Sequence, residues 1–149
     1  MTSRLSCLLL ILGQLWLVAG CANQSIAIVS PGTDLSKAKS FYVVKHSRDK
    51  RDIDQIIRGH LVERGYTVTN GPELPASDYR TDVVATYLDR WAWDIVPYMI
   101  ELNITFRVPA SGFPMATGNS LHTSLTRKSP EGMVNEVLSS IFDKAKQGP

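Results

Sequence analysis

The chain has few cysteines, few histidines and little net charge. Its 149 residues include 2 cysteines, 3 histidines, 16 basic and 14 acidic residues, and the formal net charge is +2. Such a balanced charge argues against a surface that binds nucleic acid or an anionic membrane mainly by electrostatic attraction. Two cysteines cannot supply the several disulfides that hold many small exported domains, so the fold must depend on its apolar core.

Recognisable catalytic and ligand-binding motifs are also missing. The histidines, His46, His60 and His122, have no spacing that is typical of metal ligands. The sequence contains no nucleophile elbow of the form G-x-S-x-G and no glycine loop of the kind that binds phosphate. We therefore expect no metal, no cofactor and no nucleic-acid partner, and we predict that the chain is not an enzyme.

Residues 1–20 have the order of a secretory signal peptide. Arg4 supplies the positive start, and the short apolar run LLLILGQLWLVA follows. The run is flanked by polar residues rather than by a stop-transfer cluster of charges, which favours cleavage over a membrane-spanning helix. The residues VAGC, from Val18 to Cys21, resemble the lipobox of bacterial lipoproteins. This resemblance implies cleavage between Gly20 and Cys21 and acylation of the Cys21 sulfur.

Cleavage at this point removes Cys7 and leaves 129 of the 149 residues, with 15 of the 16 basic residues against 14 acidic ones. The alternative is an ordinary signal-peptidase cut that leaves Cys21 as a free thiol. By analogy with the sorting rule of Gram-negative lipoproteins, Ala22 in place of an aspartate points to the outer membrane. We interpret residues 21–38 as the lipidated cysteine with a tether, and residues 39–149 as one domain.

The first part of this domain has the pattern of a strand, a helix and a strand. Residues 40–46, SFYVVKH, form a short apolar run that predicts a buried strand, and residues 66–69 predict a second one. Between them, Ser47 or Asp49 can cap a helix, and Gly65 can end it. The apolar stripe of this helix consists of Ile53, Ile56, Ile57 and Leu61. A strand, helix and strand in this order normally form a right-handed crossover between parallel strands.

A β-hairpin follows, and it is the clearest pattern in the chain. Residues 98–108 alternate between apolar and polar side chains, residues 82–94 precede them, and residues 95–97 can make the turn. The register that best matches apolar with apolar residues places Arg90 opposite Glu101. The same register predicts four further pairs: Trp93 with Tyr98, Trp91 with Ile100, Tyr87 with Ile104, and Ala85 with Phe106.

The remaining segments predict a strand over residues 116–124 and a final helix. Ser129 can cap this helix, and Pro130 suits its first turn. Its apolar stripe consists of Met133, Val134, Val137, Leu138, Ile141 and Phe142. Two helices with one apolar stripe each can cover one face of a sheet. We therefore predict an α+β fold in which two helices pack on one face of a mixed sheet of about five strands.

This order of elements behind a lipobox resembles a group of small bacterial lipoproteins of unknown function. The likeness rests on the entry segment DLSKAKSFYVV, on ERGYTV at the end of the crossover, and on the hairpin strand DVVATYLDRWAWD. In topology alone, the order is also similar to the N-terminal domain of the Tol translocation protein, the curli-secretion lipoprotein and the lipoprotein activators of penicillin-binding proteins. Those proteins act in assembly or as adaptors, so the resemblance implies a role in binding another envelope protein.

We expect the uncovered face of the sheet to carry the interaction surface. The candidate residues on or beside this face are Arg90, Trp93, Glu101, Asn103 and Arg107. The pattern leaves two alternatives open for Trp93, which either joins the core or forms an exposed aromatic platform at the end of the hairpin.

Asp89 is the acidic residue that the predicted register places among apolar side chains. Burial there would raise the pKa of an unpartnered carboxyl group, which is one way to make a general acid. We favour a structural role, in which Asp89 accepts hydrogen bonds from a neighbouring indole or hydroxyl group. Two other functions stay as alternatives: a carrier of a small molecule or lipid in a cavity lined by Trp91, Trp93 and Met133, and a hydrolase that uses Asp89 with His122.

Overall fold

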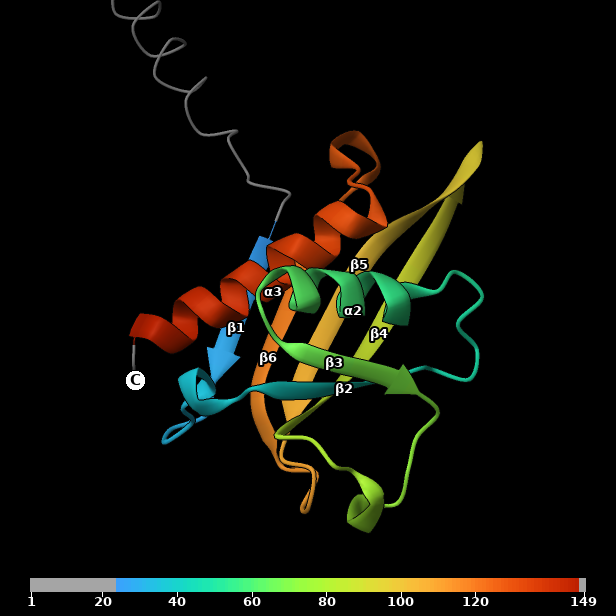
Figure 1. The fold of residues 1–149 in the computed structure, drawn as a ribbon. Coiled ribbons are helices and arrows are strands. Elements are labelled where there is room, and N and C mark those ends of the chain that lie inside the picture. The colour runs from blue at the N-terminus through green and yellow to red at the C-terminus, as the bar shows by residue number, and fades with distance from the viewer. Residues whose placement is uncertain (1–23, 148–149) are drawn as a thin grey trace, which may run out of the picture.

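The computed structural model describes residues 24–147 and shows one mixed sheet with two α-helices on the same face (Figure 1). The strands are β1 (Gln24–Val29), β2 (Ser40–Val44), β3 (Thr67–Gly71), β4 (Val83–Asp94), β5 (Val96–Arg107) and β6 (Pro114–Leu121). The helices are α2 (Ile53–Glu63) and α3 (Pro130–Gln147), with short 3₁₀ helices η2 (Leu35–Lys37), η3 (Ala76–Asp78) and η4 (Ser124–Thr126). The strand order is β1-β6-β5-β4-β2-β3. The predicted α+β class is confirmed.

The described sheet has six strands rather than about five, and the additional strand is β1. It lies in the segment that we interpreted as a tether, and it pairs antiparallel with β6. Ala27 and Val29 face the core, whereas the larger Ile26 and Ile28 are 53% and 68% exposed. Because the small residues of β1 face the helices, the strand lacks the strong apolar pattern that would have predicted it.

The predicted crossover is confirmed, because β2 pairs in parallel with both β3 and β4. Phe41 and Val43 of β2 are buried beneath α2, which buries Ile53, Ile57 and Leu61. The carboxylate of Asp49 accepts a 2.8 Å hydrogen bond from the Ile53 amide, and so satisfies a free N–H group at the start of α2.

The hairpin register is confirmed for its inner half and is wrong for its outer half. Ala85 faces Phe106 and Arg90 faces Glu101 as predicted, but the register shifts by one residue beyond Arg90. Trp91 therefore faces Met99, and Trp93 faces Pro97. The extra residue on β5 is Ile100. This β-bulge reverses the alternation, so that Met99 is buried at 1% exposure while Ile100 is only partly buried.

Helix α3 packs across β1, β5 and β6 and completes the core. The Ser129 hydroxyl accepts a 3.1 Å hydrogen bond from the Gly132 amide, as expected for a residue that caps a helix. The buried side chains of α3 are Met133, Val134, Val137, Leu138 and Ile141. Strand β6 begins and ends earlier than predicted, at Pro114 and Leu121.

Candidate functional site

The face of the sheet opposite the two helices has no layer of secondary structure over it in the described part of the chain (Figure 1). We call it the open face. All six strands contribute side chains to it, and these include Ile26, Ile28, Tyr42, Val44, Thr69, Val84, Thr86, Leu88, Arg90, Glu101, Asn103, Thr105, Arg107, Thr117 and Asn119. Of the five residues predicted for an interaction surface, the fold brings Arg90, Glu101, Asn103 and Arg107 to this face. Trp93 lies apart from them at the end of the hairpin.

The half of the open face nearer the hairpin end carries a connected set of polar side chains. The Asn119 amide group donates hydrogen bonds to Glu101 Oε1 at 3.0 Å and to Asn103 Oδ1 at 2.9 Å. The other carboxylate oxygen of Glu101, Oε2, lies 3.3 Å from Arg90 Nη2. These bonds tie β4, β5 and β6 together, and they fix the side chains of the surface before any partner binds.

Arg107 is similarly held at the other end of the strands. Its Nε donates to Thr86 Oγ1 at 3.3 Å, and its Nη1 donates to the Gly112 carbonyl oxygen at 3.1 Å. Leu88 lies among these polar side chains, and 61% of the residue is exposed. The open face is thus mixed in charge and largely paired within itself, and Leu88, Ile26 and Ile28 are exposed apolar residues on it.

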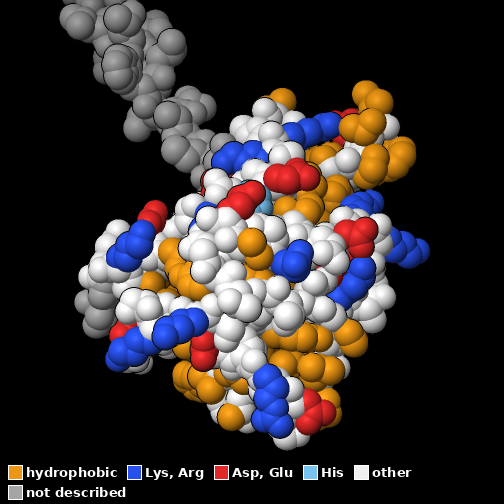
Figure 2. Space-filling view, in the orientation of Figure 1, with side chains coloured by type: hydrophobic (Ala, Val, Ile, Leu, Met, Phe, Trp, Pro, Cys, Tyr) orange, Lys and Arg blue, Asp and Glu red, His pale blue; other side chains and the backbone are white. Residues whose placement is uncertain are grey.

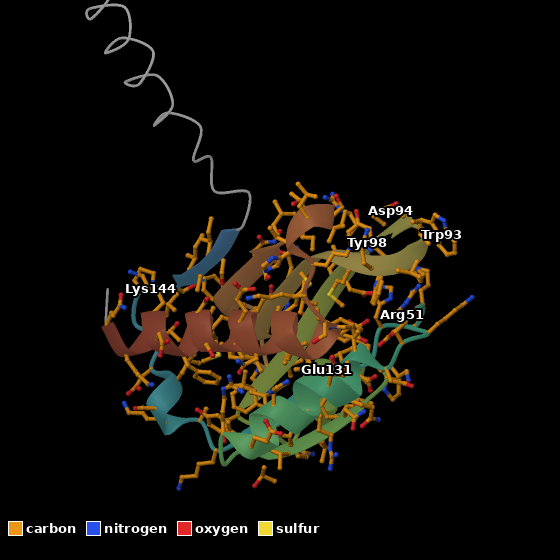
Figure 3. All side chains as sticks on the ribbon, turned by 90° about the horizontal axis from the view of Figure 1, so that it is seen from above. Arg51, Trp93, Asp94, Tyr98, Glu131 and Lys144 are labelled. Atoms are coloured by element: carbon orange, nitrogen blue, oxygen red, sulfur yellow. The ribbon has the colours of Figure 1, made fainter. Side chains whose placement is uncertain are left out.

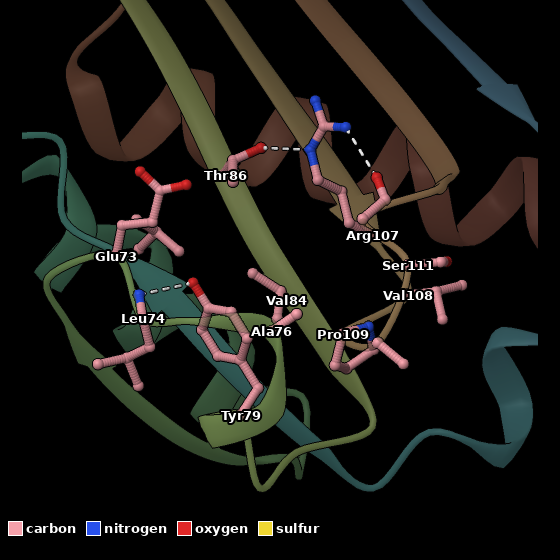
Figure 4. Close-up of a pocket in the computed structure, with 13 residues that line it drawn as sticks. Glu73, Leu74, Ala76, Tyr79, Val84, Thr86, Arg107, Val108, Pro109 and Ser111 are labelled. Carbon is pink, nitrogen blue, oxygen red and sulfur yellow. Dashed lines mark hydrogen bonds between the residues drawn. The ribbon is translucent and has the colours of Figure 1, made fainter.

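A groove of about 550 Å³ lies on the open face, at the end away from the hairpin tip (Figure 4). Its floor includes Val44, Val84 and Thr86, and its walls are the loop before β4 and the loop between β5 and β6. Tyr79 forms part of one wall: its ring packs edge-on against Tyr42, with centroids 5.2 Å apart. Its hydroxyl oxygen accepts a 3.0 Å hydrogen bond from the Leu74 amide.

Sequence reasoning missed this groove because its walls come from two segments far apart in the chain. The segment NGPELPASDY contains turn residues, and it predicts only a connection. The one available signal was Tyr79, an aromatic residue within a polar loop. The loop with Pro109 and Ala110 is likewise turn sequence, and only the antiparallel pairing of β5 with β6 brings it to the same end of the sheet.

Asp89 is only partly buried, so its carboxyl group is not fully enclosed by apolar side chains. The indole N–H of Trp91 donates a hydrogen bond to its Oδ2 atom. The Arg51 guanidinium lies 4.0 Å above the centre of the Trp91 ring, a cation–π contact. Asp89 therefore accepts a hydrogen bond from an indole group that is itself held by a cation.

A second polar cluster lies between β6 and α3, on the side of the helices. His122 Nε2 lies 2.7 Å from Glu136 Oε2, and the Ser120 hydroxyl donates to the same oxygen at 2.8 Å. Lys128 Nζ lies 3.1 Å from that oxygen too. Burial raises the pKa of Glu136, but the hydrogen bonds from His122, Ser120 and Lys128 outweigh it and leave the pKa below the usual value.

This cluster lacks the geometry of a nucleophile activated by histidine. Ser120 and His122 both bond to the carboxylate instead of to each other. Asp89, which we considered as a partner of His122, has Trp91 as its hydrogen-bond donor. The structure thus gives Asp89 and His122 separate partners.

The other sequence candidates lie apart or outside the described residues. His60 Nδ1 is 3.3 Å from Glu63 Oε2 within α2, and His46 follows β2. Among residues 24–147, no group of three or more His, Cys, Asp or Glu side chains is arranged to hold a metal ion. Cys21 and Gly20 lie outside the residues that the structure describes. No helix in the described range is long and apolar enough to cross a bilayer.

The comparisons show a likeness in fold but none in sequence. No protein-family model matches the sequence, and no curated protein matches it. PelC from Paraburkholderia phytofirmans, solved as a dodecamer, has 15% identity and a TM-score of 0.60, with 79% of this chain and 98% of PelC covered. A second PelC structure has a TM-score of 0.59. TolB from Acinetobacter baumannii has 14% identity, covers 83% of this chain and 31% of TolB, and has a TM-score of 0.45, too low to support an inference. The chain is therefore similar in fold to PelC.

Proposed function

We propose that this chain is a non-enzymatic lipoprotein of the bacterial envelope whose domain binds another protein through the open face. The proposed location in the envelope rests on the sequence, since VAGC follows a charged start and an apolar run. The acyl chains on Cys21 anchor the protein, and Ala22 favours the outer membrane, with the domain facing the periplasm.

The observation that carries the binding role is the open face with its groove. The polar side chains of this face are held by one another, so a partner meets a preformed surface at a low cost in side-chain entropy. The groove of about 550 Å³ has Val44, Val84 and Thr86 in its floor. Its other lining residues include Arg107 and Glu73, and this mixed lining suits a few side chains of a protein segment.

The first partner to test is a second copy of the same chain, because the PelC structures of similar fold are described as dodecamers. At 15% identity this likeness supports a shared fold, and self-association is the form of binding that it suggests for a test. Capture of a different envelope protein is the other outcome of the crosslinking experiment described below.

A carrier with an internal cavity is less well supported. Met133, which we expected to line such a cavity, is fully buried in the core, whereas Trp93 is 75% exposed at the hairpin end. The groove lies on the opposite side of the sheet from Met133. This groove is an open hollow of the surface and not an enclosed pocket.

Crosslinking in cells tests the surface. A photoreactive amino acid at Leu88 lies on the open face, and one at Val62 of α2 is the matched control, because both side chains are exposed. We expect an adduct from Leu88 and none from Val62, and an adduct of twice the chain's mass would identify a second copy. Adducts from Val62 with none from Leu88 would overturn the assignment of the surface.

Metabolic labelling with palmitate tests the anchor separately. The wild-type protein should incorporate label and fractionate with membranes, and Cys21→Ala should do neither. Recovery of the wild-type chain without label, with residues 1–20 still attached, would contradict the lipoprotein assignment.

A further inference from the structure

One end of the domain exposes a group of large apolar side chains. Trp93, Ile95 and Val96 form the tip of the β4–β5 hairpin, with 75%, 89% and 54% of each residue exposed, and Leu125 in η4 is 94% exposed. We call these four residues the apolar tip. Figure 2 shows hydrophobic side chains gathered at this end with Lys and Arg side chains beside them. Exposed apolar residues that cluster in this way mark a surface that contacts another apolar phase.

The backbone of the tip is unusual as well. Ile95, at the apex of the hairpin, has a φ of 62°. A β-branched residue rarely adopts this conformation, and glycine or asparagine would avoid the strain. The chain thus keeps an isoleucine at this exposed turn although the local geometry favours a small or polar residue. Such strain at an exposed position points to a role for the side chain.

The two loops of the apolar tip are fastened together. Arg127, which follows η4, forms an ion pair with Asp94 of the hairpin, and its guanidinium lies 4.2 Å above the centre of the Tyr98 ring. Figure 3, viewed onto this end of the molecule, shows Trp93, Asp94 and Tyr98 close together on the hairpin. These contacts hold Leu125 and the hairpin tip as one surface.

The chain enters the domain at this same end. Strand β1 starts at Gln24, which pairs with Leu121, three residues before η4. Figure 1 shows the start of β1, η4 and the hairpin tip at one end, with the β5–β6 turn at the other. The three peptide steps from Cys21 to Gln24 span at most about 11 Å even when fully extended.

We infer that the apolar tip inserts into the interface of the bilayer that holds the acylated Cys21. This inference rests on the proposed lipid anchor and deepens it, because only three peptide steps separate Cys21 from Gln24, and the hairpin tip extends beyond the level of Gln24 at the same end of the sheet. Tryptophan favours the boundary between headgroups and acyl chains, and the transfer of isoleucine, valine and leucine side chains out of water is favourable in free energy. Arg127 lies beside the tip in its ion pair with Asp94, and at headgroup level its guanidinium can also meet lipid phosphate groups.

Insertion would give the domain a fixed orientation. The strands of the hairpin run from the tip to the loops that wall the groove, so the groove opens at the end away from the bilayer. The acyl chains supply the affinity for the membrane, and the tip adds a second contact that limits rotation about the anchor.

The depth of a spin label tests the inference. Cys21 is the only cysteine of the chain after the signal and it is acylated, so a cysteine introduced at Ile95 is the single site for a label. Phe113→Cys is the matched control, since Phe113 is also apolar and 62% exposed but lies in the turn at the opposite end. The acylated proteins are placed in vesicles of phosphatidylethanolamine and phosphatidylglycerol.

We expect the label at position 95 to collide several-fold less often with an aqueous nickel reagent, and more often with oxygen, than the label at position 113. Equal aqueous exposure at both positions in vesicle-bound protein would overturn insertion but leave the lipid anchor standing. Failure of the acylated wild type to bind vesicles would overturn both. A photoreactive group at Ile95 that captures a protein, rather than lipid, would assign the apolar tip to a protein partner instead.

Discussion

The hydroxyl oxygen of Tyr87, on β4, lies 2.6 Å from the Asp49 carboxylate in the loop that precedes α2. The Asp49 carboxylate also accepts hydrogen bonds from the amides of Arg51 and Ile53, at 2.7 and 2.8 Å. One acidic side chain therefore fixes the start of α2 and ties it to the centre of the sheet. The bond joins residues far apart in sequence and helps to set the position of the helix that covers β2 and β3.

Tyr87→Phe should lower the free energy of unfolding by about 1.5–3 kcal/mol, because it removes a hydrogen bond to a charged group and leaves the ring in place. Tyr98→Phe is the control, since the Tyr98 ring packs under Arg127 near the surface, and it should change stability by no more than about 0.5 kcal/mol. Denaturant unfolding monitored by circular dichroism measures both. Equal effects of the two variants would contradict the structural role of the Tyr87 hydroxyl.

The same carboxylate should make stability depend on pH in acid. Burial raises the pKa of Asp49, but the hydrogen bonds from Tyr87 and from the amides of Arg51, Ile53 and Asp54 outweigh it, so the pKa in the folded state lies below 3.8. The unfolded chain then binds a proton at higher pH than the folded one. The contribution of Asp49 is complete above a pH of about 3.8 and is lost as the pH falls through the lower, folded value.

Comparison of the wild type with Asp49→Asn checks this sign. The variant should be less stable at neutral pH, and the difference in the free energy of unfolding should shrink below a pH of about 3.8. Urea unfolding at a series of pH values gives the difference directly. A difference that grows in acid would contradict the lowered pKa.

Gly118 allows α3 to lie close to β6, and an added methyl group should not fit. A Cβ atom at this position would stand 2.8 Å from side-chain carbons of Val137 and Ile141. We expect Gly118→Ala to destabilise the fold by about 1–3 kcal/mol through overpacking. Thermal unfolding should show partial rescue in the double variant with Val137→Ala.

Gly59 provides the contrast for that substitution. It lies in α2, and a Cβ atom there would have no neighbour within 4 Å. Gly59→Ala should therefore stabilise the protein, by up to about 1 kcal/mol, through helix propensity alone. If both alanine variants were stabilising, the close approach of α3 to β6 would be wrong.

The bulge in β5 makes a prediction opposite to that of the sequence pattern. Met99→Ala should cost about 2–5 kcal/mol, because Met99 is buried in the core, whereas Ile100→Ala should cost clearly less. Uninterrupted alternation from Tyr98 to Val108 predicts the reverse order. Denaturant unfolding of the two variants decides between the registers.

Much of the fold follows from local patterns with a single dominant period. The stripe from Ile53 to Leu61 predicted α2, and the alternation of Leu102, Ile104 and Phe106 predicted the inner hairpin, because each pattern reflects one buried face. Strand β1 escaped prediction because Ala27 and Val29 are its inward residues. Their small size fits the space under α3, and it leaves the larger isoleucines on the outside.

The candidate surface was predictable only in part. Arg90, Glu101, Asn103 and Arg107 were located by register, which the inner hairpin pattern fixes. The place of Trp93 could not be derived, because the bulge at Ile100 has no marker such as glycine in the sequence. The groove depends on two loops that only the complete sheet brings together, and the bond of Asp89 with Trp91 depends on side-chain rotamers that no periodicity encodes.

The bulge at Ile100 also divides the hairpin into two parts in which substitutions have different effects on the core. On the inner side of the kink, each substitution must suit the helices packed beneath it. On the outer side, Trp93, Ile95 and Val96 are mostly exposed, and the turn is held to Arg127 through Asp94. We therefore expect this outermost turn to accept changes of length or chemistry that would disrupt the core if they were made on the inner side of the bulge. The surface that the hairpin presents can thus change while the interior stays the same.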